Sequence, residues 1–337
     1  MQYIPSRGTF QGTAFASNSM MAWILRILLF LSFWSSMGFA QEPACPTADL
    51  RQRPWPALHY HQPGKSWCYA IVTSDLVSAE MHTPVSAVSL ANFTERSQDS
   101  YESKVKAYIY RNNSFLYRFS FIGQSYETAF SVSQKQGMCT YSILDQMRDQ
   151  PHVKDIYLDD VFYELEKIRS QNPQELRTRL HGLFDSLRAG FAEQVFAQAS
   201  DKKRPLIDIA VDLSCEKKVD ISTLELISRD LNKISEEDAA SSISALLTQG
   251  KTVGIGYNSK LLYQPRYAAR EQTDHASMLV GQYFDQNSKT CKYVIRATDL
   301  YTCQVSDPSL KCQNGYFTVN REDALQAMGT FMWLQKP

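Results

Sequence analysis

Residues 62–70 read QPGKSWCYA, and the run that begins at the cysteine, CYAIVTSDLVSAEM (68–81), decides the fold. The apolar residues of that run recur at helical spacing and cover one wide side: Ala70, Ile71, Leu76, Val77 and Met81. Pro84 follows, and a proline just past the last turn is a stop signal. We therefore expect a helix that begins at Cys68 and is preceded by a turn containing Gly64 and Ser66.

The position of Cys68 favours nucleophilic chemistry. The exposed N–H groups and the macrodipole at a helix N-terminus stabilise a thiolate and lower the pKa of a thiol. Because the thiolate is the nucleophilic form, the first residue of a helix is a suitable place for a reactive cysteine. The alternative is that Cys68 is half of a disulfide, the usual state of a cysteine in an exported protein.

The number of cysteines bears on this choice. The chain has seven, so one thiol is left over when the other six pair: Cys45, Cys139, Cys215, Cys291, Cys303 and Cys312. The sequence does not fix the pairing, but Cys139 with Cys215 would close a long helical stretch, and one local bridge is expected among the last three. Cys68 is the best-placed candidate for the unpaired thiol.

A candidate base lies in the segment DHASMLVG, residues 274–281. Of the six histidines, His275 alone opens a strand-like run in the C-terminal part of the chain. A nucleophilic cysteine needs a base that takes its proton and later delivers it to the leaving group. A thiol on a helix and an imidazole on a strand can face each other across a cleft. A surface or capping histidine is the alternative interpretation.

The remaining patterns indicate an α+β protein. Residues 44–64 are rich in proline and polar residues and predict an extended surface strap, and residues 155–200 and 221–248 carry helical spacing. Two alternating runs, 105–110 and 116–121, predict a hairpin. From residue 252 onward, short strand-like pieces follow one another at 253–257, 276–280, 293–295 and 316–319. Early helices and late strands predict segregated layers.

The N-terminus predicts export. Residues 21–40 read MAWILRILLFLSFWSSMGFA, in which Arg26 precedes an apolar run and Gly38 and Ala40 supply the small residues of a cleavage site. The apolar run falls short of the roughly 20 residues that span a bilayer; an uncleaved anchor is the alternative. We expect residues 1–40 to be upstream sequence and signal peptide, and residues 41–337 to be one exported domain, periplasmic or secreted, with disulfides.

Composition excludes several classes of function. The 337 residues carry 35 Lys+Arg against 35 Asp+Glu, so nothing in the net charge favours nucleic acid or, after signal cleavage, an anionic membrane. No Cys or His spacing suggests zinc, and there is no P-loop or dinucleotide fingerprint, so no metal or cofactor is predicted. Asp155, Asp159 and Asp160 are compatible with a cation site, but the start of a helix also favours carboxylates.

Taken together, these segments resemble the papain-like cysteine peptidases, the family of papain and the cathepsins. Gln62 stands six residues before Cys68, the spacing of the family's oxyanion-hole side chain, and Cys68-Tyr69-Ala70 stands where the family has Cys-Trp-Ala. Further segments are similar in the same order: TPVSAVSL (83–90), LLTQGKTVGI (246–255), the His275 segment and GYF (315–317). The similarity covers most of the chain after residue 40.

The resemblance implies a two-layer fold. Its N-terminal half would be helical around a central helix starting at Cys68, and its C-terminal half an antiparallel sheet or barrel. Cys68 as thiolate would attack a peptide carbonyl, His275 would act as base and then acid, and Gln62 would stabilise the oxyanion. The implied partner is a peptide or protein substrate, and the implied enzyme is a cysteine-type peptidase without a cofactor.

The chain departs from the family pattern in two places. Ala297 occupies the position of the family's Asn, which orients the histidine; Asp299 lies two residues on, where strand alternation would point it to the same side. Its carboxylate would then hold the imidazole, unless it is a solvated loop residue. The second departure is a helical insertion at roughly 150–220, either plain structure or a contact for an inhibitor or partner.

These departures keep two other functions open. The missing Asn would suit a peptidase-like binding protein that has lost catalysis. The same Cys–His chemistry would also suit a cysteine acyltransferase that passes the acyl group to an amine instead of water.

Overall fold

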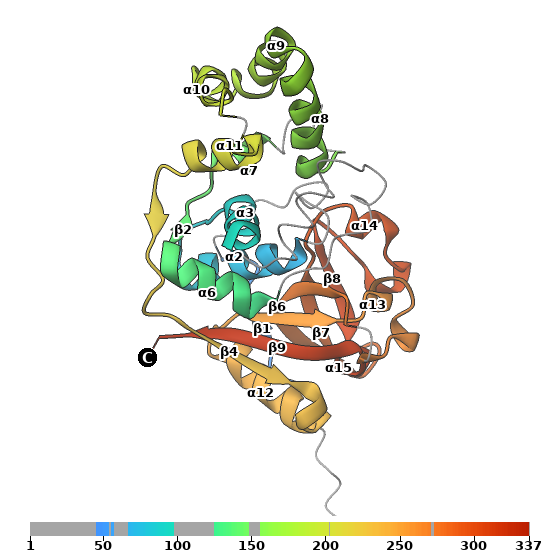
Figure 1. The fold of residues 1–337 in the computed structure, drawn as a ribbon. Helices are drawn as coiled ribbons and strands as arrows, with labels where there is room; N and C mark the ends of the chain where they lie inside the picture. The colour runs from blue at the N-terminus through green and yellow to red at the C-terminus, as the bar shows by residue number, and fades with distance from the viewer. Residues whose placement is uncertain are drawn as a thin grey trace, which may run out of the picture. The chain divides into compact units, whose positions relative to one another are not determined.

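The computed structural model describes residues 45–53, 55–56, 67–97, 125–147, 156–201, 203–270 and 273–336, all within the unit that begins at Cys45. Helices dominate the first part of this unit and strands the second (Figure 1). The predicted signal peptide, the predicted hairpin at 105–121 and Gln62 lie outside the described residues.

Helix α2 (Cys68–Met81) is the central helix, as predicted, and every residue from Tyr69 to Ala79 is buried. Burial on all sides differs from the single wide apolar side that the sequence suggests. The hydroxyl groups of Thr73, Ser74 and Ser78 make this possible, because each donates to a carbonyl one turn earlier. The helix ends at His82, whose φ of 52° is left-handed.

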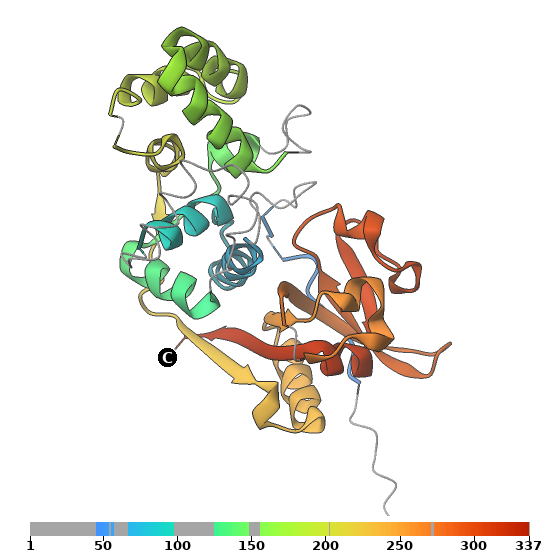
Figure 2. The same ribbon diagram turned by 45° about the vertical axis from the view of Figure 1, so that its right-hand side comes forward.

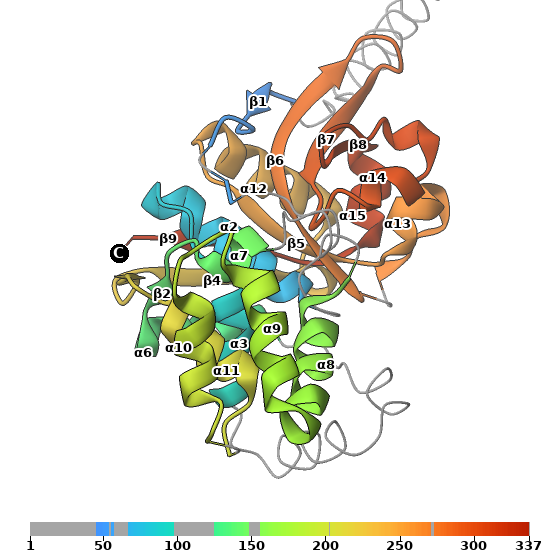
Figure 3. The same cartoon turned by 90° about the horizontal axis from the view of Figure 1, so that it is seen from above.

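Helices α3 (Ala87–Ser97) and α6 (Tyr126–Gln136) pack against α2. After α7 (Ile143–Met147), the stretch predicted to be a helical insertion is helical: α8 (Leu158–Gln171), α9 (Pro173–Phe184), α10 (Phe191–Gln198) and α11 (Leu206–Ser214). Figure 3 shows α8 to α11 side by side. Asp159 and Asp160 lie in the first turn of α8, where carboxylates are favoured, so this turn explains them without a cation.

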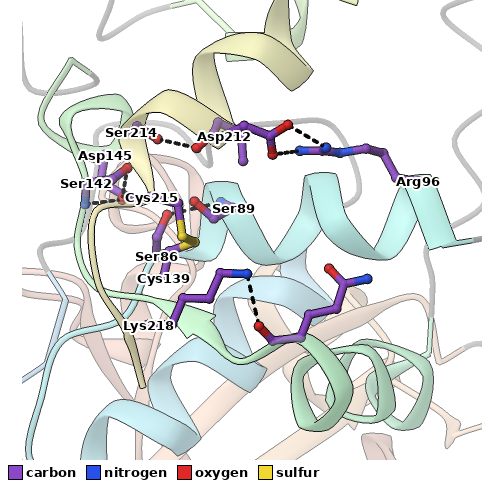
Figure 4. Close-up of a disulfide and its surroundings, with 12 residues drawn as sticks. Ser86, Ser89, Arg96, Cys139, Ser142, Asp145, Asp212, Ser214, Cys215 and Lys218 are labelled. Atoms are coloured by element: carbon purple, nitrogen blue, oxygen red, sulfur yellow. Dashed lines mark hydrogen bonds and ion pairs between the residues drawn. A yellow bond between two sulfur atoms is a disulfide. The ribbon is translucent and has the colours of Figure 1, made fainter. Parts of the chain in front are cut away.

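The insertion is joined to the rest of the helical half at its base. Strands β2 (Met138–Cys139) and β3 (Lys218–Val219) pair antiparallel, and the disulfide Cys139–Cys215 bridges the same point (Figure 4). Next to the disulfide, Arg96 of α3 forms a two-pronged ion pair with Asp212 of α11 at 2.8 and 3.1 Å. These contacts fix the insertion against α3.

Seven of the described strands form one antiparallel sheet (Figure 2). Along the sheet they are β4 (Glu225–Asp230), β9 (Met328–Gln335), β5 (Val253–Tyr257), β6 (His275–Asp285), β7 (Thr290–Arg296) and β8 (Tyr316–Asn320), with β1 (Ala48–Asp49) added to β6. The remaining elements are η1 (Leu231–Lys233), α12 (Glu236–Thr248), α13 (Lys260–Tyr263), η2 (Pro265–Tyr267), α14 (Thr302–Val305), η4 (Pro308–Leu310) and α15 (Arg321–Ala327). The α+β class is confirmed.

One predicted helix is wrong in part. The spacing over residues 221–248 predicts a helix, but β4 occupies Glu225–Asp230 and only α12 is helical. The reason is tertiary: β4 pairs with β9 over its whole length, and pairing at a sheet edge overrides local spacing. The helix starts where the Ser235 side chain accepts a hydrogen bond from the Asp238 N–H.

Strand β6 separates two hydrophobic cores. Its residues Ala276, Met278 and Val280 join the core of the helical half, while Leu279 faces the second core on the other side of the sheet. Helix α2 approaches the sheet closely at Gly254 of β5, where a Cβ atom would lie 2.9 Å from Val72 Cγ1. The glycine therefore sets how tightly the central helix packs on the sheet.

Six of the seven cysteines pair and one is left over, as the odd number of cysteines predicts. Disulfides join Cys45 to Cys291, Cys139 to Cys215 and Cys303 to Cys312, and Cys68 is the free thiol. Within the described ranges, no helix is both long and apolar enough to cross a membrane.

Candidate active site

Cys68 lies at the start of α2, where that helix meets strand β6. The backbone N–H groups of Tyr69 and of Ala276, the residue after His275, lie close enough to its thiol to favour the thiolate and lower its pKa. Burial nevertheless raises the pKa of the thiol to about 11, because these N–H groups offset only part of the desolvation. The N–H groups at the helix N-terminus lower the pKa, as the sequence predicts, but burial outweighs them, so the thiol is protonated at neutral pH.

His275 opens β6 opposite Tyr257 of β5, and the two rings meet edge to face with centroids 5.4 Å apart. Burial lowers the pKa of the imidazole, and the charges of Asp299 and Asp274 act in the opposite direction. The ring is therefore neutral at pH 7. Its Nε2 atom is buried and has no hydrogen-bond partner among the described residues.

The charge of Asp299 acts on the His275 imidazole and raises its pKa against the effect of burial. The Oδ1 atom of Asp299 accepts hydrogen bonds from both the N–H and the hydroxyl of Thr302 at 2.8 Å, at the start of α14. Ala297, which stands at the family's Asn position, is buried and offers no side-chain acceptor to Nε2. Asp299 therefore acts on the imidazole through charge, without a hydrogen bond to Nε2.

Two tyrosines close to this group were not singled out from the sequence. Tyr257 interacts electrostatically with both Cys68 and Asp299, and its hydroxyl hydrogen-bonds Ser277 at 2.9 Å. Tyr126, at the start of α6, also interacts with Cys68, and burial raises the pKa of its phenol well above the ordinary value. Only the strand pattern at 253–257 pointed to Tyr257, and no sequence pattern pointed to Tyr126.

The structure thus gathers Cys68, His275 and Asp299 in one neighbourhood, where α2 meets the sheet. Gln62 lies outside the described residues, so its place in the oxyanion hole stays a prediction. The arrangement combines a protonated thiol, a neutral imidazole on the residue before Ala276 and a carboxylate whose charge acts on that imidazole. Chemically, it offers a nucleophile that a base can activate.

No protein-family model and no curated protein sequence matches the chain. Solved structures that it matches include the proform of the Amb a 11 cysteine protease, a ragweed pollen allergen (10% identity, 88% of this chain, 67% of that chain, TM-score 0.44). Another is digestive procathepsin L 3 of Tenebrio molitor larval midgut (11% identity, 88% of this chain, 71% of that chain, TM-score 0.42). A third is SERA5E from Plasmodium falciparum (9% identity, 84% of this chain, 91% of that chain, TM-score 0.42). The roles proposed below therefore rest on the residues of this chain.

Proposed function

We propose that the chain is an exported cysteine-type peptidase in which Cys68 is the nucleophile and His275 the base. The observation that carries the proposal is the single free thiol at the start of α2, which lies close to the N–H of Ala276, the residue after His275. The resemblance of the surrounding segments to papain-like peptidases supports the same assignment.

The protonation states favour activation by a base over a preformed thiolate. At neutral pH the thiol, whose pKa is about 11, keeps its proton. The buried imidazole, whose pKa is lowered, is free to accept it. As the sulfur–carbon bond forms, the proton passes from Cys68 to His275. The imidazolium then donates it to the amine nitrogen as the carbon–nitrogen bond breaks, and water cleaves the thioester with His275 again as base.

Two further groups would stabilise the charges that develop. The Gln62 side chain and the Cys68 N–H are proposed to bind the oxyanion, and the nearby Asp299 charge would stabilise the imidazolium. This chemistry requires no cofactor.

The disulfides support the proposed compartment. Bridges of this kind persist in oxidising surroundings, so three of them within the described residues fit a periplasmic or secreted protein. The proposed partner is a peptide or protein substrate. The insertion α8 to α11 stays a candidate contact for an inhibitor or partner protein.

The test is peptide cleavage by the chain without residues 1–40, read by mass spectrometry on a mixture of casein peptides. Cys68→Ala and His275→Ala should abolish cleavage, whereas His181→Ala, a matched histidine variant on exposed α9, should not. Gln62→Ala should lower kcat by about 10²–10³-fold.

Other outcomes would assign other functions. Cleavage that survives Cys68→Ala would overturn the proposal. Peptide capture without cleavage, unaffected by Cys68→Ala, would indicate a binding protein. Products that carry an added amine in place of water would indicate an acyltransferase.

A further inference from the structure

A buried ion pair joins the central helix to the sheet. Asp75 lies seven residues after Cys68 on α2, which places the two side chains on the same face, about 10 Å apart along the axis. Its Oδ2 atom accepts a hydrogen bond of 2.9 Å from Nε of Arg296, the last residue of β7. The two side chains are only 2% and 3% exposed.

The same guanidinium also contacts the strap that precedes α2. Nη2 of Arg296 donates to the carbonyl of Pro56 at 2.5 Å, and its central carbon lies 5.4 Å from the centroid of the Trp55 ring. Arg296 pairs in register with Met278 of β6, three residues after His275. One side chain thus connects α2, the strand next to His275 and the strap.

This arrangement is not a favourable way to gain stability. Replacing a buried ion pair by apolar side chains of similar volume is often neutral or stabilising, because desolvating two charges is costly. Here Oδ1 of Asp75 and Nε1 of Trp55 are also buried without a hydrogen-bond partner among the described residues. What the pair supplies instead is a fixed orientation of three segments.

We propose that Asp75 and Arg296 are positioning residues for the Cys68–His275 pair. They fix the rotation of α2 against β6 and β7, which keeps the Cys68 thiol near the N–H of Ala276. They also hold Trp55 and Pro56 of the strap. The inference rests on the proposed peptidase function, since displacing a reacting group by about 1 Å can cost about 10²-fold in rate.

The test compares two double variants of the chain without residues 1–40. Asp75→Leu/Arg296→Met, here called the clamp variant, removes the buried Asp75–Arg296 ion pair. Glu80→Leu/Lys251→Met is the matched control, because that pair also joins α2 to the sheet half, at 2.9 Å, but lies at the far end of the helix from Cys68. Both variants should keep the wild-type circular dichroism. The clamp variant should lose about 10²-fold in kcat with KM changed less than about threefold, and the control should lose neither. An unchanged kcat in a folded clamp variant would overturn the inference.

A second readout separates this inference from the proposed function. Amide hydrogen exchange should become at least about tenfold faster in the clamp variant at Trp55 and in the first turn of α2, and not in the control. If the parent protein cleaves no peptide, the proposed function fails, but the exchange readout still tests the positioning role. Exchange in the clamp variant that equals that of the parent protein at these sites would overturn the positioning role. If the clamp variant does not fold, Asp75→Asn, which is nearly isosteric, is judged by the same two readouts.

Discussion

Two of the three disulfides, Cys139–Cys215 and Cys303–Cys312, close loops of different length and should differ measurably in their contribution to stability. Cys139–Cys215 closes a separation of 76 residues that holds the helical insertion, whereas Cys303–Cys312 closes only 9. In the chain-entropy account the stabilisation grows with the logarithm of the closed loop. For these separations it is about 4.5 kcal/mol for the larger loop and about 2.6 kcal/mol for the smaller, a difference of about 2 kcal/mol.

The assay is urea unfolding of two double variants, Cys139→Ala/Cys215→Ala and Cys303→Ala/Cys312→Ala, followed by circular dichroism. The first should lose about 2 kcal/mol more of its free energy of unfolding than the second. Equal losses, or a larger loss for the short loop, would refute the reasoning. Such a result would show that the helical insertion is already constrained in the unfolded chain without its disulfide.

Three further predictions follow from single sites. Asp75→Ala should lower the free energy of unfolding by about 3–5 kcal/mol because it leaves the Arg296 charge buried and unpaired; a loss below about 1 kcal/mol in urea unfolding would contradict this. Gly281→Ala places a Cβ atom 2.7 Å from a backbone carbonyl of β1, so hydrogen exchange at the Leu50 amide should become faster; unchanged protection would argue against the close approach. Hydrogen bonds to two carboxylates raise the pKa of His181 above 6.5, so its stabilising effect is complete below pH 6.5 and is lost as the pH rises through the raised pKa. Hydrogen exchange in α9 and α10 should therefore be slower at pH 6 than at pH 8, a difference that His181→Gln should abolish.

The sequence predicts the parts of this fold that depend on local pattern. The apolar spacing predicts α2, and Pro84 predicts its C-terminal end, because a proline just past the last turn stops a helix. The odd number of cysteines identifies a free thiol, and the position of Cys68 selects it. The strand-like pieces after residue 252 are short and apolar, and the sheet uses each of them.

What the sequence does not predict depends on contacts between distant residues. The pKa of Cys68 is raised because burial in the folded chain disfavours the thiolate, which the helix position alone does not indicate. Strand β4 exists because β9 lies beside it, more than 100 residues later in the chain. The Asp75–Arg296 pair joins positions 221 residues apart. The sequence shows only a charged residue inside each of two apolar segments, and this does not indicate that the two residues pair.

The most direct test of the proposed pair is alkylation of Cys68 by iodoacetamide across pH 4 to 11, with mapping of the labelled site, in the parent protein and in His275→Ala. We predict labelling at Cys68 alone in two phases. The rate should rise first as His275 loses its proton, below pH 6.5 because its pKa is lowered, and again toward pH 11 as the thiol ionises. His275→Ala should remove the first phase and keep the second. Equal rates with and without His275 at every pH, or a Cys68 that does not label, would contradict the assignment of Cys68 and His275 as nucleophile and base.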